Sequence, residues 1–109
     1  MKIKSVALVV AALVGLVASQ AEPAFFDVAI DHKNPEMGTY KMQYLVDDQY
    51  FKDRSELKPR PIFFYAGNEG SIWDFYKNSG FMTETLAKQY GALVVFAEHR
   101  YFGLSWPFP

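Results

Sequence analysis

Two short, continuous apolar runs dominate the hydrophobic pattern of the chain. Residues Ile62–Ala66 and 92–97 are apolar or aromatic throughout, and a glycine follows the first run directly. An uninterrupted run of this length predicts a central strand covered on both faces, as in parallel sheets. We therefore expect two buried strands.

A helical pattern lies between these runs. Met82, Leu86 and Tyr90 recur every four residues, which predicts an amphipathic helix. The Asn-Ser pair at 78–79 is a suitable N-cap and Gly91 a suitable stop. Strands joined by a helical crossover pair in parallel with a right-handed connection, so we expect an α/β sheet.

The preceding segment is less regular. Residues 25–31 have mixed apolar character and predict either a short strand or an extended arm, and the turn-rich residues 32–38 predict a loop. Residues 39–46 alternate as in a half-buried strand. Its predicted apolar face carries Tyr40, Met42, Tyr44 and Val46, opposite Lys41, Gln43 and Leu45. Residues 47–60 are polar and predict a connection. An edge strand within this segment is an alternative interpretation.

The first 21 residues have the pattern of a secretory signal peptide. Lys2 and Lys4 precede an apolar run at 6–17, and small residues at 18–21 would permit cleavage after Ala21. A membrane anchor is the alternative, but the run is shorter than the roughly 20 residues that span a bilayer. We expect the mature chain in the secretory pathway, either extracellular or lysosomal or vacuolar, with no stable membrane span.

Composition excludes several classes of function. The chain has 109 residues, no cysteine and a net charge of -1, and no basic cluster of the kind that binds nucleic acid. Lack of cysteine removes disulfides, thiol catalysis and Cys-ligated zinc from this stretch. No metal or cofactor is expected. Aromatic residues make up 17% of the chain, which suggests a core larger than residues 22–109 can enclose.

The two least ordinary sequences follow the two apolar runs. They are the glycine-rich loop 67–70 and the loop 98–105, and ligands of α/β sheets bind beyond the carboxyl ends of such strands. Gly67 and Gly70 would let the backbone turn sharply and point N–H groups inward. That geometry stabilises the oxyanion of acyl transfer, and a loop after the third strand supplies one such donor in α/β-hydrolases.

The runs 61–82 and 93–108 resemble motifs of the lysosomal prolyl-Xaa carboxypeptidase and dipeptidyl-peptidase II family of serine exopeptidases, and residues 31–51 resemble its entry strands. The resemblance implies an α/β-hydrolase core with an inserted helical lid and a Ser-Asp-His triad. It also implies a peptide substrate, cleaved next to proline or small residues near one end. A homodimer of the full-length enzyme and the choice between carboxypeptidase and dipeptidyl-peptidase stay open.

The resemblance assigns roles to ten residues of the two loops. Those of the oxyanion and pocket loop are Gly67, Asn68, Glu69 and Gly70, with the Asn68 N–H as the best candidate donor. Those of the active-site scaffold are Glu98, His99, Arg100, Tyr101, Gly103 and Ser105. No G-x-S-x-G is present, since the nearest approach, around Ser105, has proline for its second glycine. The triad is expected beyond Pro109, and residues 22–109 are expected to be an incomplete, inactive part of the peptidase domain.

Several residues have a structural and a functional interpretation. For His99, a structural hydrogen bond is favoured over a catalytic pair with Glu98, because adjacent strand residues point to opposite faces. For Glu69, an ion pair with Arg100 is favoured over binding of a substrate amine. Arg100 is interpreted as a buried organiser rather than a carboxylate clamp.

The aromatic residues after the first loop are interpreted as structural. The residues Trp73, Phe75 and Tyr76 are expected to pack in the core or against the lid, in preference to stacking on a substrate proline. A zinc site from His32, His99 and a carboxylate lacks a supporting motif. For the chain as a whole, the alternative function is a non-catalytic secreted binding module that keeps the pocket loops.

Overall fold

The computed structural model describes residues 21–109. The predicted signal peptide therefore lies outside the described residues, except for Ala21. Within the described part of the chain, no helix has both the length and the apolar character needed to cross a bilayer.

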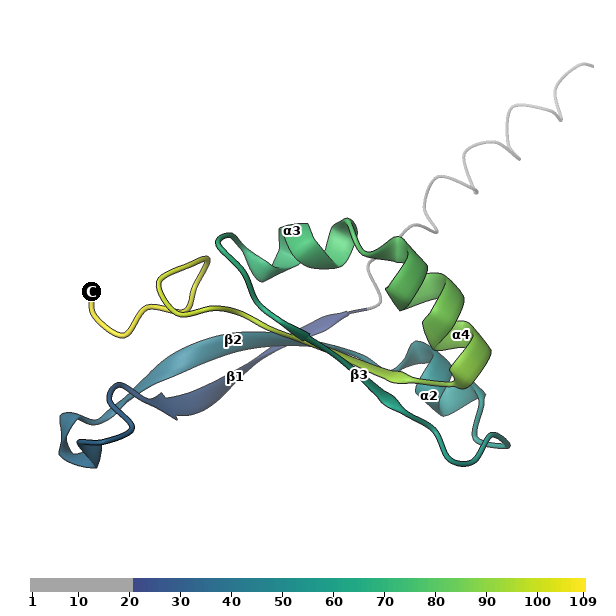
Figure 1. The fold of residues 1–109 in the computed structure, drawn as a ribbon, viewed down its shortest axis with the longest axis horizontal. Coiled ribbons are helices and arrows are strands. Elements are labelled where there is room, and N and C mark those ends of the chain that lie inside the picture. Colours follow the sequence, from purple (N-terminus) through teal and green to yellow (C-terminus); the bar gives the residue numbers. More distant parts are fainter. Residues whose placement is uncertain (1–20) are drawn as a thin grey trace, which may run out of the picture.

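A twisted four-stranded sheet with the order β1-β2-β4-β3 forms the framework (Figure 1). Strands β1 (Glu22–Ala29) and β2 (Thr39–Asp47) pair antiparallel, and β2 pairs antiparallel with β4 (Leu93–Ala97). Strand β3 (Ile62–Ala66) pairs in parallel with β4. The predicted parallel pair is confirmed, and the chain has a mixed α/β structure.

The crossover between β3 and β4 lies on one face of the sheet (Figure 1). It consists of α3 (Ile72–Lys77), the π-helical segment η2 (Phe81–Leu86) and α4 (Ala87–Tyr90). Gly91 ends α4 in the left-handed conformation, with φ 59°, as the sequence predicts. Two short elements complete the set, the 3₁₀ turn η1 (Pro35–Met37) and helix α2 (Gln49–Asp53). Helix α2 occupies part of the segment for which the sequence permits an edge strand.

The predicted helix start is confirmed, because the helical segment begins at Gly80 and the Ser79 carbonyl oxygen accepts hydrogen bonds from Met82 N and Thr83 N, both at 3.0 Å. The side chains of Asn78 and Ser79 do not cap it, because a helix that was not expected, α3, precedes them. Asn78 Nδ2 donates to the Asp74 carbonyl oxygen at 2.8 Å, and Ser79 Oγ donates to the Phe75 carbonyl oxygen at 2.6 Å. Both side chains therefore satisfy carbonyl groups at the end of α3. No side-chain cap bonds the N-terminus of η2.

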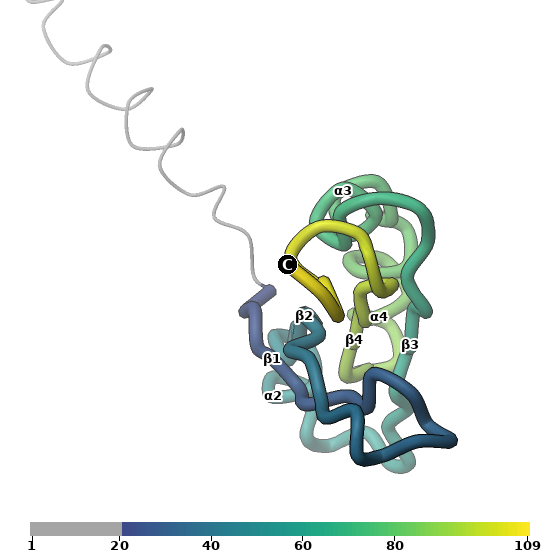
Figure 2. The backbone as a smooth tube through the Cα atoms, turned by 90° about the vertical axis from the view of Figure 1, so that its left-hand side faces the viewer, coloured from purple at the N-terminus to yellow at the C-terminus, as the bar shows by residue number. Residues whose placement is uncertain are grey.

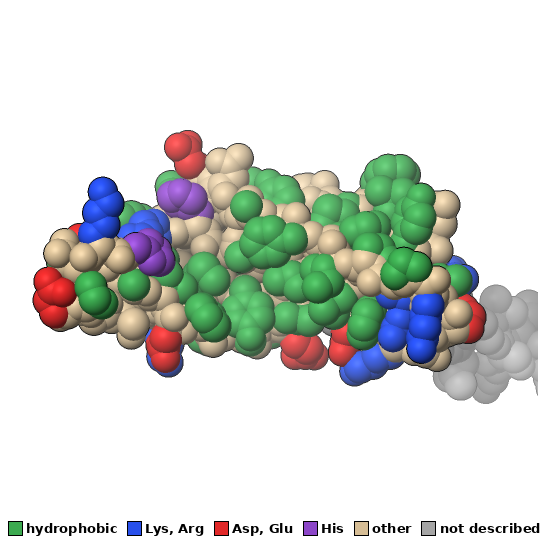
Figure 3. Space-filling model, turned by 60° about the horizontal axis from the view of Figure 1, so that its bottom comes forward, with side chains coloured by type: hydrophobic (Ala, Val, Ile, Leu, Met, Phe, Trp, Pro, Cys, Tyr) green, Lys and Arg blue, Asp and Glu red, His purple; other side chains and the backbone are tan. Residues whose placement is uncertain are grey.

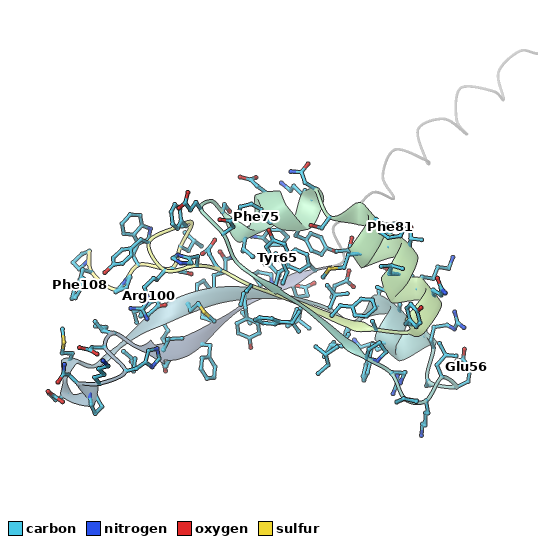
Figure 4. All side chains as sticks on the ribbon, in the orientation of Figure 1. Glu56, Tyr65, Phe75, Phe81, Arg100 and Phe108 are labelled. Carbon is cyan, nitrogen blue, oxygen red and sulfur yellow. The ribbon has the colours of Figure 1, made fainter. Side chains whose placement is uncertain are left out.

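Aromatic packing joins the helices to the sheet. The ring of Tyr65 lies between those of Phe96 and Phe75, with centroid distances of 4.8 Å and 5.7 Å (Figure 4). Tyr76 meets Phe96 edge-on at 5.4 Å and is itself buried. Trp73 packs against the same cluster. The prediction that Trp73, Phe75 and Tyr76 pack in the core is thus confirmed. Large aromatic rings in such contacts supply much of the buried area of a small domain.

The face of β2 that lies under the helices differs from the prediction. It carries Gln43, Leu45 and Asp47, all buried, whereas Met42 and Tyr44 on the predicted apolar face are only half-buried. Asp47 is accommodated because its Oδ2 accepts a hydrogen bond from the Tyr76 hydroxyl at 2.7 Å. Burial raises the pKa of Tyr76, and the bond to Asp47 raises it further.

The opposite face of the sheet is apolar and lacks helices within the described residues. Figure 3 shows hydrophobic side chains gathered across it. Ile62 and Phe64 on β3 are 64% and 61% exposed. Within residues 21–109, β3 stands at the end of the strand order and only its inner face is covered, so the predicted central position is not seen among these residues.

A hydrogen bond between two helical segments predicts that stability depends on pH. The Tyr50 hydroxyl donates to Glu84 Oε2 at 2.6 Å, tying α2 to η2. This bond, with burial as the second cause, raises the pKa of Tyr50 to about 12. The folded state therefore keeps the phenol proton, and the stabilisation is complete below the unfolded pKa near 10 and lost as the pH rises toward 12.

Replacing Tyr50 with phenylalanine should remove one phenolate absorbance step near pH 12 in an ultraviolet titration of the folded protein. A titration in which that step survives the replacement, or in which the missing step lies near pH 10, would contradict the bond between Tyr50 and Glu84.

Candidate active site

The two predicted loops lie against each other at the carboxyl ends of β3 and β4. The Gly67 N–H donates to the Ala97 carbonyl oxygen at 2.7 Å. A Cβ atom on Gly67 would lie 2.5 Å from that oxygen and 2.5 Å from the His99 nitrogen. Only glycine lets the two backbones approach this closely.

The loop from Gly67 to Gly70 uses most of its own N–H groups. Glu69 N donates to Asn68 Oδ1 and Gly70 N to the Asn68 carbonyl oxygen, both at 2.8 Å. With the Gly67 bond, three of the four N–H groups are engaged. The fourth belongs to Asn68, whose side chain is exposed, and it meets no acceptor among residues 21–109. The loop is therefore held in one conformation that leaves one backbone donor available.

Glu98, the first residue of the second loop, is the centre of its hydrogen-bond network. Its side chain is buried, with 2% of the residue exposed. Oε2 accepts a hydrogen bond from Ile72 N at 2.9 Å, and Oε1 accepts from Leu104 N at 2.9 Å and from Ser105 Oγ at 2.7 Å. The Ser105 oxygen in turn accepts from Gln43 N at 2.8 Å. One carboxylate thus connects α3, the loop 98–105 and, through Ser105, strand β2.

The loop around Glu98 is tightly wound. Tyr101 and Gly103 both have left-handed backbones, with φ 72° and 53°. Tyr101 N donates to the Ser105 carbonyl oxygen at 2.7 Å, which closes the turn. A Cβ atom on Gly103 would lie 1.9 Å from Glu98 Oε2. Figure 2 shows this loop curled beside α3, as the bond from Ile72 to Glu98 requires.

Ser105 is fully buried, with 0% exposure. Its hydroxyl donates to Glu98 and accepts from the Gln43 backbone. Both roles of the hydroxyl are structural, and no face of it meets solvent.

Arg100 organises the hairpin of β1 and β2. Its guanidinium donates to the Ile30 carbonyl oxygen at 2.9 Å and the Ala29 carbonyl oxygen at 3.4 Å, and lies 5.2 Å from the centroid of the Tyr40 ring. Figure 4 shows it directed toward that hairpin. The predicted ion pair with Glu69 does not form, because these carbonyl groups take the guanidinium and Glu69 is exposed.

Glu98 and His99, the first two residues after β4, point to different environments, as the sequence predicts. Glu98 is buried, and His99 is exposed. His99 Nδ1 lies 2.8 Å from the Arg100 carbonyl oxygen, and its ring meets Phe102 at 5.6 Å. In residues 21–109, no three His, Cys, Asp or Glu side chains cluster closely enough to hold a metal ion.

Two residues of the network are missed by the sequence analysis. Ile72 contributes a backbone donor and a buried side chain, but no helix is predicted for its segment there. The spacing of Ile72 and Tyr76, four residues apart and both apolar, is the available helical signal. Gln43 contributes two backbone groups. Its N–H donates to Ser105 Oγ, and its carbonyl oxygen accepts from Glu98 N at 2.9 Å. No sequence pattern indicates a role that depends on the backbone alone.

Comparison with known proteins adds independent information. The family model described as Serine carboxypeptidase S28 matches residues 29–109. Lysosomal Pro-X carboxypeptidase of Mus musculus is 41% identical over 93 residues, which are 84% of this chain and 18% of that protein. Prolyl carboxy peptidase like protein 5 of Caenorhabditis elegans is 56% identical over 48 residues, or 44% of this chain and 9% of that protein. The chain thus spans less than a fifth of the length of these relatives.

Proposed function

Because the chain belongs to the serine carboxypeptidase S28 family, we propose that it is part of a serine-type exopeptidase that cleaves peptides next to proline or small residues. Within that enzyme, the loop from Gly67 to Gly70 contributes a wall of the active site and one donor of the oxyanion hole. The relatives named Pro-X carboxypeptidase favour removal of a C-terminal residue.

The Asn68 N–H, which meets no acceptor among residues 21–109, carries this proposal. In α/β-hydrolases, one oxyanion donor comes from the loop that follows the third strand. The loop 67–70 follows β3, the third strand along the chain. Its other three N–H groups are bonded within the protein, and these bonds keep the turn tight around the fourth. A donor that is fixed before substrate binds stabilises developing charge most effectively.

The apolar outer face supports a larger α/β-hydrolase core of which residues 22–109 form one part. A groove of about 300 Å³ runs between β3 and η2, lined by Ile62, Phe63, Phe64, Met82 and Leu86. Parallel strands are normally covered on both faces. Further elements of the same fold would bury Ile62 and Phe64 and pair with the free edge of β3.

Expressed alone, residues 22–109 should therefore fold poorly. We expect a broad, non-cooperative thermal transition and strong binding of a hydrophobic dye, because the outer face stays open to water. Circular dichroism and dye fluorescence measure both properties. A sharp, reversible transition without dye binding would show that this segment is a self-sufficient domain, as a separate binding module would be.

The first 21 residues are proposed to be a cleaved signal peptide that directs the enzyme into the secretory pathway. The relatives include lysosomal proteins, and a lysosomal or extracellular location would suit this leader.

The function is tested on the full-length protein that carries this segment. We expect a fluorophosphonate probe to label it at one serine outside residues 21–109, and peptides with a penultimate proline to lose their C-terminal residue in mass spectra. Peptides with an amidated C-terminus and with proline second from the N-terminus distinguish a carboxypeptidase from a dipeptidyl-peptidase. Absence of both labelling and hydrolysis would contradict the proposal.

A further inference from the structure

Glu98 is the first residue of the loop 98–105, and nothing in the chemistry proposed above uses it. It is a buried carboxylate without an ion pair among the described residues, since the three salt bridges there involve other groups. Its partners are two backbone N–H groups and one hydroxyl. Burying a carboxylate is unfavourable unless hydrogen bonds replace its hydration. These three bonds therefore hold the carboxylate, and the carboxylate holds the three donors.

We propose that Glu98 is a positioning residue that fixes the direction of the Asn68 N–H, an inference that rests on the proposed function. The decisive contact is between Glu98 Oε2 and Ile72 N, at 2.9 Å. Ile72 is the first residue of α3. Its side chain is fully buried, so this end of the segment 67–72 is held by both backbone and side chain.

The other end of the segment is fixed by Gly67. The Gly67 N–H bonds to Ala97, the residue immediately before Glu98. Both ends of the Asn68 turn are thus held by neighbouring residues of β4 and its loop. Because Asn68 lies between the two attachments, loss of the Ile72 bond would let the turn rotate about Gly67. A displaced donor would stabilise the transition state less while substrate binding changed little.

Replacing Glu98 with glutamine separates this role from packing. The amide keeps the size of the side chain but has one acceptor oxygen in place of two. If that oxygen serves Leu104 and Ser105, the NH₂ group faces the Ile72 N–H, and the bond is lost. Asp47→Asn is the matched control, because it makes the same carboxylate-to-amide change at a buried residue that bonds Tyr76 and Gln49, outside both loops.

The experiment measures kcat and KM of the full-length protein and its two variants on one proline-containing peptide. Complete loss of an oxyanion donor lowers kcat by about 10²–10³. For Glu98→Gln, which displaces the donor, we expect a fall in kcat of about tenfold to a hundredfold with KM changed by less than about threefold. Asp47→Asn should keep kcat within about twofold. Glu98→Asp, which is one methylene too short to bridge the loops, should lower kcat like Glu98→Gln.

Amide hydrogen exchange supplies a readout besides activity. The Ile72 amide should exchange faster in Glu98→Gln than in the unsubstituted protein or in Asp47→Asn. Unchanged exchange at Ile72, an unchanged kcat, or an equal loss of kcat in both variants would overturn the positioning role while leaving the peptidase itself established. An unsubstituted protein that neither hydrolyses the peptide nor reacts with fluorophosphonate would instead contradict the proposed function.

Discussion

Replacing Gly67 with alanine is expected to destabilise the folded protein by about 2–4 kcal/mol, the sum of overpacking against backbone and the weakening of one hydrogen bond. The new Cβ would lie 2.5 Å from both the Ala97 oxygen and the His99 nitrogen. Neither is the mobile end of a side chain, so β3 and the loop after β4 must separate. That separation would break the bond between Gly67 N and the Ala97 oxygen and move the Asn68 donor.

Gly80→Ala is the control for this substitution. Gly80 has a right-handed helical backbone, with φ -58°, and no atom lies within 4 Å of its added Cβ. Alanine there should be neutral or stabilise by about 0.4–1 kcal/mol, because it restricts the unfolded chain. Urea denaturation of the full-length protein measures both variants. If Gly67→Ala unfolds at the same urea concentration as the unsubstituted protein, the close approach of the two loops is contradicted.

Replacing Gly103 with alanine should destabilise the fold by about 2–5 kcal/mol, from left-handed backbone strain and from overpacking. The Cβ would lie 1.9 Å from Glu98 Oε2. Glu98 cannot retreat without giving up its bonds to Ile72, Leu104 and Ser105. We therefore expect activity to fall together with stability.

Gly38→Ala separates the two causes. Gly38 also has a positive φ, 86°, but its added Cβ meets no atom within 4 Å. With ψ -162°, Gly38 lies in the extended positive-φ region that is nearly restricted to glycine, so alanine there should show only backbone strain, about 1–3 kcal/mol. Urea midpoints that are equal for Gly38→Ala and Gly103→Ala would mean that Glu98 does not fill the space beside Gly103.

The sequence is most informative where a local pattern decides the outcome. Continuous apolar runs identify β3 and β4, a glycine identifies the end of α4, and the glycines of the loop 67–70 identify a tight turn. Each of these depends on residues close in the chain. The resemblance of the two loops to a peptidase family agrees with the family match over residues 29–109.

The sequence is least informative where distant residues compete for the same contact. The predicted pairing of Arg100 with Glu69 is wrong because the carbonyl groups of Ala29 and Ile30 meet the guanidinium first. The face of β2 under the helices is not its predicted apolar face, because Asp47 on that side bonds the Tyr76 hydroxyl, 29 residues away. Polar residues on a buried face are stable only with such partners, and alternation along one strand does not reveal them.

The position of β3 shows a different limit. Its apolar run correctly predicts a strand, and it would suit burial on both faces, yet the described residues cover one face only. A run of apolar residues reports the environment of the whole fold rather than of one segment.

A crystal structure of the full-length protein with a peptidyl boronate or phosphonate bound to its serine tests most directly whether Asn68 is an oxyanion donor. The quantity to measure is the distance from the Asn68 nitrogen to the nearest oxygen of the tetrahedral adduct. We predict about 2.7–3.1 Å, the range for oxyanion donors. An adduct whose oxygen is held by other donors, with the Asn68 N–H directed to solvent, would contradict this role.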